Sequence, residues 1–204
     1  GVVDENYNVI VNNETAVEAL TFYAGLLNEY GVVPPDVVTY GYNEILTALQ
    51  QGKVAMGIEW MAATATLQDC EQSPLVCRDG EPLLQYTLVP GIRLEDGTVQ
   101  RGQGGSQWAW VIPAAAENQE SAYKFIEWLT GFEGARQWAL NGGIPSNALA
   151  LADPEVVAIV PQFELLAEAM PYRHLFPATT VSSIMVNAFN DAINSAAAGV
   201  KTPQ

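Results

Sequence analysis

Residues 49–60, LQQGKVAMGIEW, decide the fold class of this chain. The helical pattern before them ends at Gly52, because glycine commonly follows the last turn of a helix. From residue 53 onward, larger apolar residues alternate with small ones, which is the period of a β-strand. Trp60 stands at the end of that alternation. The stretch therefore predicts a helix, a turn and then a buried strand over residues 53–60.

The same change of period recurs on both sides of this stretch. Asn13 or Thr15 is expected to cap the first helix, because Thr15 and Glu18 have the spacing of a capping box. Asp96-Gly97 predicts a tight turn. This order indicates an α/β protein with more helix than strand. The expected helices are 15–30, 42–51, 61–68, 117–130, 132–140, 153–170 and 180–198, and the expected strands are 53–60, 83–89 and 107–112.

Length, composition and charge limit the classes of protein to which the chain can belong. It has 204 residues, 49% of them hydrophobic, which favours one domain or two small ones with a substantial core. Eight Lys and Arg against 23 Asp and Glu give a net charge of -15, so nucleic acids and anionic membranes are poor partners. No apolar run approaches the roughly 18 residues of a membrane span. The opening letters, GVVD, resemble the middle of a longer gene product.

Two cysteines, Cys70 and Cys77, flank a short polar stretch that contains Pro74. Their spacing is too wide for a Cys-x-x-Cys redox or zinc motif. The turn can bring the two ends together, and a disulfide there would contribute roughly 2.5 kcal/mol. Such a bridge would place the protein in an oxidising compartment outside the cytoplasm. The alternative is a pair of unpaired thiols in a loop.

Catalytic and metal-binding motifs are missing from the sequence. The single histidine, His174, is interpreted as a surface or hydrogen-bonded residue rather than a general base. The glycine-rich residues 102–105 precede a predicted strand instead of opening a helix, which disfavours a dinucleotide site. Two carboxylates can form a glycosidase site, but no pair here is singled out by its neighbours. We therefore expect no catalytic residue, no metal and no cofactor.

Aromatic residues gather at the ends of the predicted elements. Trp60 ends a strand, Trp108 and Trp110 follow two glycines, and Tyr42 opens a helix. Such residues can pack at the rim of a core. They can also bind the apolar face of a sugar ring, with polar groups nearby for the hydroxyls. Composition does not choose between these two interpretations.

Several short motifs resemble family 1 extracellular solute-binding proteins, the maltose-binding-protein-like receptors of ABC importers. Their order and spacing over nearly the whole chain match the family rather than any one ligand. The Cys70–Cys77 pair departs from the family pattern, and small residues replace a tryptophan in the last helix. The matching stretches are 16–23 (AVEALTFY), 49–60, 88–91 (LVPG), 104–105 (GG), 121–129 (SAYKFIEWL), 142–146 (GGIPS), 153–154 (DP) and 196–199 (AAAG).

The resemblance implies a periplasmic-binding-protein type II-like fold with two lobes, of which this chain forms the C-terminal portion. Residues 1–103 and 150–204 would belong to the C-terminal lobe. Residues 104–149 would return to the N-terminal lobe, the rest of which is absent from this sequence. The glycine pairs at 104–105 and 142–143 would lie near the crossings between lobes.

The resemblance also implies a function. Members bind a sugar or polyol outside the cytoplasm, in the bacterial periplasm or as cell-surface lipoproteins, and deliver it to the membrane permease subunits of an ABC transporter. No catalysis is expected. The alternatives are a secreted carbohydrate-active enzyme and a protein-interaction module with exposed aromatic residues.

By position, the resemblance assigns Trp60 to stacking on a sugar ring. The backbone at Gly104 and Gly105 would lie against the ligand, since a missing side chain allows close approach. Trp108 would form a second stacking platform. Each role competes with a packing or solvent-exposed one. The candidate partners for ligand hydroxyls or carboxylates are Tyr42, Glu59 and Arg173.

Overall fold

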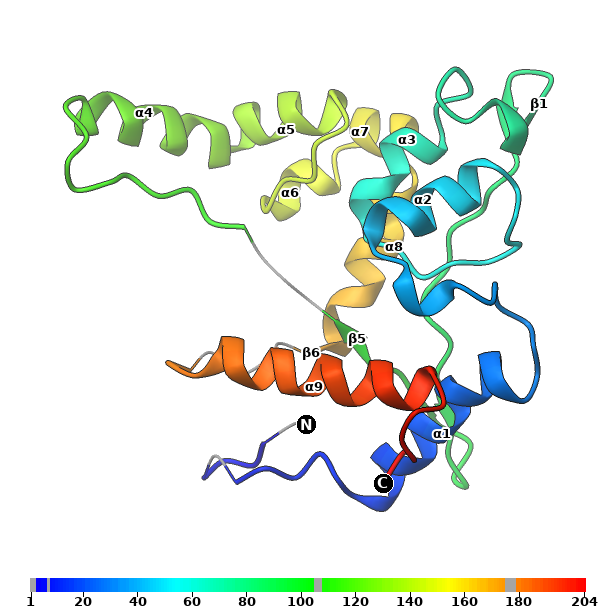
Figure 1. The fold of residues 1–204 in the computed structure, drawn as a ribbon. Coiled ribbons are helices and arrows are strands. Elements are labelled where there is room, and N and C mark those ends of the chain that lie inside the picture. Colours follow the sequence, from blue (N-terminus) through cyan, green and yellow to red (C-terminus); the bar gives the residue numbers. More distant parts are fainter. Residues whose placement is uncertain (1–2, 7, 105–107, 175–178) are drawn as a thin grey trace. The chain divides into compact units, whose positions relative to one another are not determined.

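The computed structural model describes residues 3–6, 8–104, 108–174 and 179–204. Helices dominate these residues (Figure 1). The α-helices are α1 (Glu14–Asn28), α2 (Tyr42–Gln50), α3 (Thr64–Leu67), α4 (Gln119–Thr130), α5 (Phe132–Leu140), α6 (Ala148–Leu151), α7 (Pro154–Ile159), α8 (Gln162–Ala169) and α9 (Ser182–Ala197). Short 3-10 helices are η1 (Val37–Thr39), η2 (Met61–Ala63), η3 (Pro74–Val76) and η4 (Met170–Tyr172).

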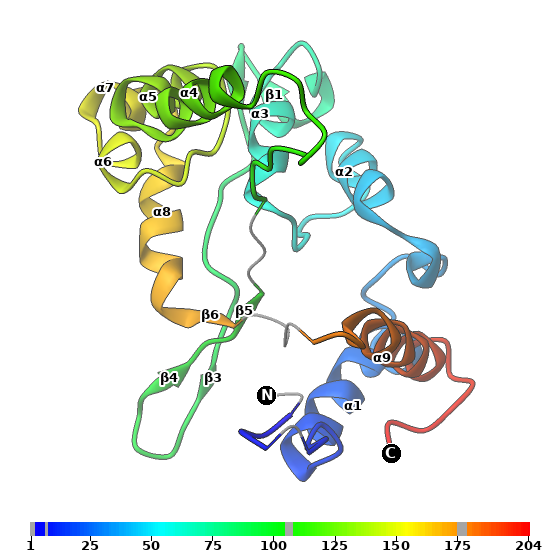
Figure 2. The same cartoon turned by 90° about the vertical axis from the view of Figure 1, so that its left-hand side faces the viewer.

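Strands in the described part of the chain form short pairs. The hairpin of β3 and β4 turns at Gly97, whose positive φ of 84° suits glycine, and this confirms the predicted turn (Figure 2). The pair of β5 and β6 is parallel. The strands are β1 (Cys77–Arg78), β2 (Glu81–Pro82), β3 (Ile92–Arg93), β4 (Val99–Gln100), β5 (Gln103–Gly104) and β6 (Arg173–His174).

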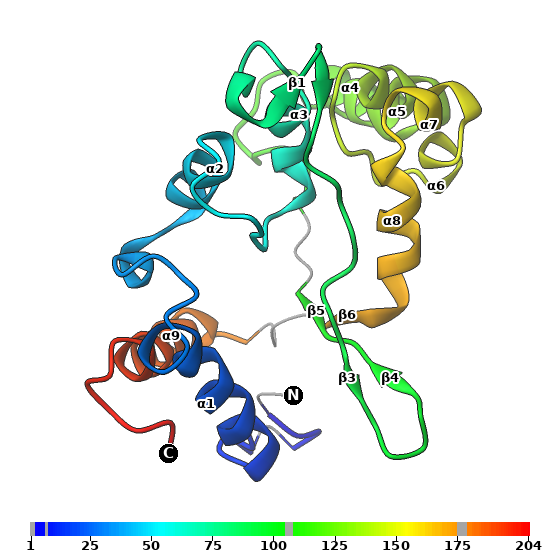
Figure 3. The same ribbon diagram turned by 90° about the vertical axis from the view of Figure 1, so that its right-hand side faces the viewer.

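The chain divides into two compact units. The first contains Gly1–Gly57 and Leu175–Gln204, and the second contains Ile58–His174. In the first unit, α1 and α9 pack side by side (Figure 3). The Asn28 side-chain amide at the end of α1 donates a hydrogen bond of 2.9 Å to the carbonyl of Ala197 in α9. The start and the end of the sequence are therefore joined in one unit.

In the second unit, α5, α6 and α7 pack together. Their core centres on Ala139, Val156 and Phe163, which are almost fully buried. At the surface of this core, Arg136 of α5 forms ion pairs with Asp153, at 3.2 Å, and with Glu155. These two ion pairs fix α5 against the start of α7.

Helix ends follow local signals, with two corrections. Asn13 caps α1 by accepting a hydrogen bond from the Ala16 amide, so the expected capping box at Thr15 does not form. Asp153 caps α7 by accepting hydrogen bonds from the Glu155 and Val156 amides, and Pro154 occupies the first helical position. The helix expected over 153–170 is wrong because Pro161 interrupts it, and α7 and α8 are separate helices. Proline lacks the amide hydrogen that a continuous helix needs.

The three predicted strands are wrong. The described residues of 53–60, 83–89 and 107–112 form no strand. Met56, Ile58 and Val111 are strongly exposed, at 89%, 72% and 78%. An alternating sequence becomes a strand only where a neighbouring strand accepts its backbone hydrogen bonds, and the described part of the chain supplies none to these stretches. The assignment of 1–103, 104–149 and 150–204 to lobes stays a prediction.

The predicted disulfide between Cys70 and Cys77 is confirmed, with Cα atoms 5.7 Å apart. It closes a loop in which Ser73 is fully buried and donates a hydrogen bond of 2.8 Å to the carbonyl of Thr66. The loop continues directly into β1. The bridge therefore ties the end of α3 to the β1–β2 hairpin.

Candidate functional site

Trp60 lies at the junction between an extended segment and a helical turn. Its own backbone is extended, and its carbonyl accepts a 2.9 Å hydrogen bond from Ala63 in η2. Ala63 and Leu67 of the following helical turns are buried and anchor the junction. The indole itself is 65% exposed. A fixed backbone thus presents a large aromatic surface to solvent.

The Glu59 carboxyl group lies against the same junction. Its Oε2 accepts a hydrogen bond of 3.1 Å from the Trp60 amide. Its Oε1 is buried and finds no hydrogen-bond partner among the described residues. Burial raises the pKa of Glu59, and the hydrogen bond from Trp60 opposes that rise. Buried polar atoms without a hydrogen-bond partner are rare, and this sets Glu59 apart from the other described carboxyl groups.

A second grouping of predicted residues forms at the parallel pair of β5 and β6. Gly104 lies opposite His174, and Arg173, which is half-buried, lies opposite Gln103. Gly104 and Arg173 are therefore diagonal neighbours across the pair. Gly105 lies outside the described residues.

The remaining predicted residues, Tyr42 and Trp108, differ in exposure. Tyr42 belongs to the first unit and is the first residue of α2, where it is half-buried. The Glu44 side chain accepts a hydrogen bond from the Gly41 amide and so fixes this end of α2. Trp108 belongs to the second unit and is 94% exposed. The structure shows where these side chains lie, and their roles in binding stay predictions.

The structure contains a hollow lined by three tryptophans that the sequence did not predict. Its volume is about 400 Å³. The rings of Trp110 and Trp138 meet edge to face at 6.1 Å. A side chain at Gly143 would collide with the Trp138 indole, so glycine there allows the ring its place. In the sequence, Trp128 and Trp138 stand inside predicted helices with nothing to set them apart. Only Trp110, which follows two glycines, was singled out as an aromatic residue at the end of an element. The lining residues are Trp110, Trp128, Leu129, Gly134, Gln137, Trp138 and Asn141.

A second cavity, of about 350 Å³, is lined in part by Met61, the residue that follows Trp60. Most of its walls are apolar. The Gln68 amide in the wall is already engaged, because it donates a 3.0 Å hydrogen bond to the carbonyl of Leu84. The lining residues are Met61, Thr64, Ala65, Gln68, Gly142, Ile144 and residues 158–163.

Metal and membrane features can be assessed for the described ranges 3–6, 8–104, 108–174 and 179–204. Within them, no three His, Cys, Asp or Glu side chains gather as metal ligands would. None of the helices found in the same ranges is long and apolar enough to cross a membrane.

Curated relatives of the chain are ABC transporter binding proteins. A probable ABC transporter-binding protein of Deinococcus radiodurans is 30% identical over 202 residues, which are 98% of this chain and 45% of that protein. A probable amino-acid ABC transporter periplasmic-binding protein of Sinorhizobium fredii is 25% identical over 198 residues, 94% of this chain and 41% of that protein. The chain therefore spans less than half the length of these relatives.

Solved structures share the fold of the chain. The maltose-bound MalE3 of T. maritima superimposes with a TM-score of 0.79 at 22% identity, covering 100% of this chain and 50% of that one. A solute-binding protein of Agrobacterium radiobacter K84 in complex with ribitol gives a TM-score of 0.74, also at 22% identity and with the same coverage. These similarities establish a periplasmic-binding-protein type II fold, of which the chain forms about half.

The family is shown directly by the sequence. The model of the family described as bacterial extracellular solute-binding protein matches residues 1–136, more than half of the 204 residues. The chain belongs to the family of bacterial extracellular solute-binding proteins.

Proposed function

We propose that this chain is part of an extracytoplasmic receptor that binds a sugar or polyol for import by an ABC transporter, without chemical conversion of the ligand. The observation that carries the proposal is the exposed indole of Trp60, held on a fixed backbone beside the Glu59 carboxyl group. An aromatic face for the ring and a polar group for the hydroxyls are the two elements of sugar recognition.

The energy available from Trp60 can be approximated from its surface. A tryptophan side chain buries roughly 150–250 Å² when fully enclosed, and a ligand on one face covers about a third of that. At about 25 cal/mol per Å², the contact contributes about 1.5 kcal/mol, which is roughly tenfold in Kd. Trp60 alone therefore supports weak binding, and other groups must supply the rest.

The other groups in the proposal come from the remaining predicted positions. Gly104 and Gly105 would bring backbone close to the ligand, and Trp108 would offer a second aromatic surface. Tyr42 and Arg173 would supply polar contacts. In the proposed lobes, residues 1–103 and 150–204 belong to one lobe and residues 104–149 to the other.

The ligand class rests on chemistry and on the neighbours. The structural neighbours were solved with maltose and ribitol, both rich in hydroxyl groups. An amino acid is the competing class, because the Sinorhizobium relative carries that description. An amino acid carries a carboxylate, which Glu59 would repel, and an ammonium group, which Glu59 would attract, so titration with ligands of both classes decides between them.

Location and partners follow from the same proposal. The Cys70–Cys77 disulfide fits an oxidising compartment such as the periplasm or the cell surface. The receptor would deliver its ligand to the membrane permease subunits of the transporter. Charge repulsion by the acidic chain makes nucleic acid an unsuitable partner.

Isothermal titration of this chain with maltose, ribitol and L-glutamine tests the proposal. We expect maltose or ribitol to bind in the millimolar range, about -4 kcal/mol, and Trp60→Ala to weaken that binding roughly tenfold. Tyr123→Ala removes an aromatic ring of comparable exposure, 58%, on α4 and should change nothing. Binding of L-glutamine alone would contradict the ligand class, and hydrolysis of a glycoside would indicate an enzyme.

A further inference from the structure

Asn141 and Gly142 form the single Asn-Gly pair of the sequence. An asparagine side chain can deamidate when the backbone nitrogen of the next residue attacks its Cγ atom and closes a succinimide ring. Glycine in the second place favours this attack, because it has no side chain to shield the nitrogen and its backbone is the least restricted. Both residues of the pair are exposed. Asn141 is therefore the asparagine that its neighbour in sequence makes most reactive.

The folded chain holds this pair in the end of α5. Gly142 has a positive φ of 84°, and its amide donates a 3.0 Å hydrogen bond to the carbonyl of Ala139. The Gly143 amide donates one of 2.9 Å to the carbonyl of Trp138. These two bonds across a left-handed glycine form the Schellman motif, which ends many helices. The nitrogen that would attack is thus tied to the last turn of α5.

Asn141 itself is held away from the reactive geometry. Ring closure needs the Gly142 nitrogen to eclipse the Cβ atom of Asn141 about the Cα–C bond. At the observed ψ of 21°, this nitrogen instead nearly eclipses the backbone nitrogen of Asn141. The Asn141 side-chain amide also donates a 2.8 Å hydrogen bond to the carbonyl of Gln137. The reaction therefore requires the last turn of α5 to open first.

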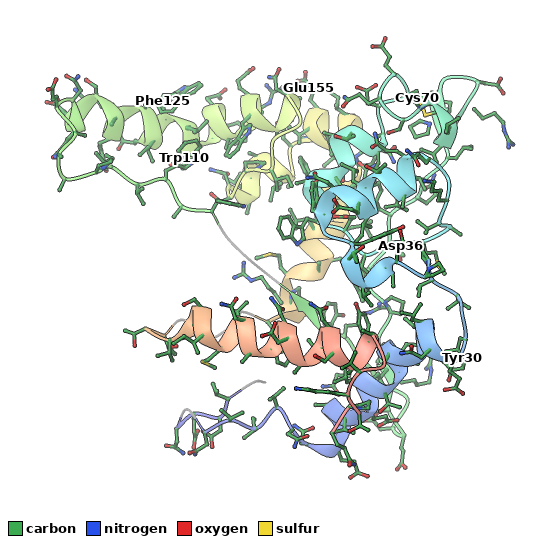
Figure 4. The ribbon with its side chains drawn as sticks, viewed as in Figure 1. Tyr30, Asp36, Cys70, Trp110, Phe125 and Glu155 are labelled. Atoms are coloured by element: carbon green, nitrogen blue, oxygen red, sulfur yellow. A yellow bond between two sulfur atoms is a disulfide. The ribbon has the colours of Figure 1, made fainter. Side chains whose placement is uncertain are left out.

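Opening can be confined to this last turn. In the preceding turn, Arg136 pairs with Asp153 and with Glu155 at the start of α7 (Figure 4). Ala139 is fully buried in the core of the second unit. Asn141 is exposed beyond it, and helix ends open at a much smaller cost in free energy than a packed core does. The end of α5 can therefore fray while the rest of the helix stays in place.

We propose that Asn141 is a modification site, which deamidates to aspartate or isoaspartate when the last turn of α5 opens, and that the product keeps this turn open. The Gly142 nitrogen loses its proton to hydroxide and attacks Cγ of Asn141. The Cγ–Nδ2 bond breaks, and ammonia leaves with a proton taken from water. Water then adds to either carbonyl of the succinimide and opens the ring. The net reaction consumes water and releases ammonia, so it needs no oxidant or other co-reactant.

The product does not fit the closed turn. A carboxylate in place of the Asn141 amide has no hydrogen to donate to the Gln137 carbonyl. Its negative charge also lies at the C-terminal end of a helix, where the helix dipole disfavours anions. Isoaspartate lengthens the backbone by one carbon atom, which displaces Gly143 from its hydrogen bond to Trp138. The modification therefore disturbs the turn on which the Trp138 ring lies.

Mass spectrometry of the chain after incubation in mildly alkaline buffer, with and without guanidinium chloride, tests the proposal. Trypsin releases residues 137–173 as one peptide, which contains Asn141 and also Asn147, an asparagine followed by alanine. We expect Asn141 to convert at least about tenfold faster in denaturant than in native buffer, because opening of the turn limits the native rate. Asn147 should stay unchanged in both solutions. Equal rates at Asn141 in the two solutions, or no conversion in denaturant, would overturn the proposal.

A matched pair of glycine variants tests the control by the end of α5. A side chain at Gly143 would collide with the Trp138 indole, whereas one at Gly102 would meet open space. We expect Gly143→Ala to speed the conversion of Asn141 at least about threefold in native buffer and to leave the rate in denaturant unchanged. Gly102→Ala should alter neither rate. A native rate that Gly143→Ala does not change would show that the closed turn does not control the reaction.

The effect of the product is measured on two further variants. Asn141→Asp introduces the charge of the product, and Asn141→Ala removes only the hydrogen bond to Gln137. We expect Asn141→Asp to have the lower Tm of the two at neutral pH, and the difference to shrink in high salt, which screens the charge from the helix end. Equal Tm values would show that the carboxylate does not keep the turn open.

Discussion

Removal of the Cys70–Cys77 bridge tests how the second unit is held together. The double variant Cys70→Ser/Cys77→Ser opens a loop whose ends are seven residues apart in sequence. In the chain-entropy model, closing so short a loop stabilises the folded state by about 2.5 kcal/mol. For a protein of this length, that corresponds to a Tm lower by about 5–10 °C.

The structure says where the loss falls. The loop holds the buried Ser73 hydroxyl on the Thr66 carbonyl, and the following hairpin begins at Cys77. Thermal unfolding followed by circular dichroism, with and without reductant, measures the shift. Reductant should lower the Tm of the wild type to that of the variant and leave the variant unchanged. A shift below about 1 °C in the variant would show that the bridge does not stabilise the protein by constraining the unfolded chain.

Three further predictions concern single side chains. Burial raises the pKa of Glu59 in the folded protein, so the wild type loses stability as pH rises through that pKa and the carboxyl group becomes charged. Glutamine stays neutral, so Glu59→Gln should stabilise the protein more at pH 7 than at pH 4, as measured by urea unfolding. Asp153→Ala should cost about 1–2 kcal/mol at pH 7 by removing the cap of α7. Burial raises the pKa of Asp153, but the hydrogen bonds from backbone amides and the ion pair with Arg136 lower it by more, so the folded pKa lies below the usual value. The stability that a lowered pKa contributes is lost as pH falls through the folded pKa. The cost of Asp153→Ala should therefore be smaller at low pH. Gly143→Ala should displace the Trp138 ring and cost about 1–3 kcal/mol, with a change in tryptophan emission, whereas Gly102→Ala, with open space around it, should have no effect.

Local signals in the sequence predicted the helices well. The pair Asp153-Pro154 starts α7, and Gly52 follows the end of α2 with a φ of 62°. The break between α7 and α8 was also readable, because Pro161 stands inside the predicted helix and its ring removes a backbone donor. Each of these signals depends on only a few neighbouring residues, so the sequence alone contains the information needed to read it.

The strands could not be predicted in the same way. Residues 53–60 alternate as a strand does, but alternation describes side-chain burial and not the neighbour that supplies the hydrogen bonds. That neighbour is distant in sequence or lies in another part of the fold. The sequence therefore placed Trp60 at the end of a buried strand, whereas the structure places it after an exposed extended segment.

The candidate site was predictable only in part. Trp60, which the sequence singles out, is exposed, and the family follows from motifs spread along the chain. The buried Oε1 of Glu59 depends on packing around the junction, which no motif encodes. The hollow at Trp138 depends on a ring lying over Gly143, a contact that helical spacing does not reveal.

The stacking of Trp60 on a sugar or polyol is tested most directly by the indole N–H signals in a nitrogen-15 NMR spectrum. The chain has five tryptophans, and Trp60→Phe identifies the signal of Trp60. On titration with maltose or ribitol, we expect the Trp60 signal to shift and to saturate in the millimolar range, while those of Trp128 and Trp138 stay in place. A Trp60 signal that does not move with either ligand, or that stays fixed while Trp128 and Trp138 shift, would show that Trp60 does not stack on the ligand.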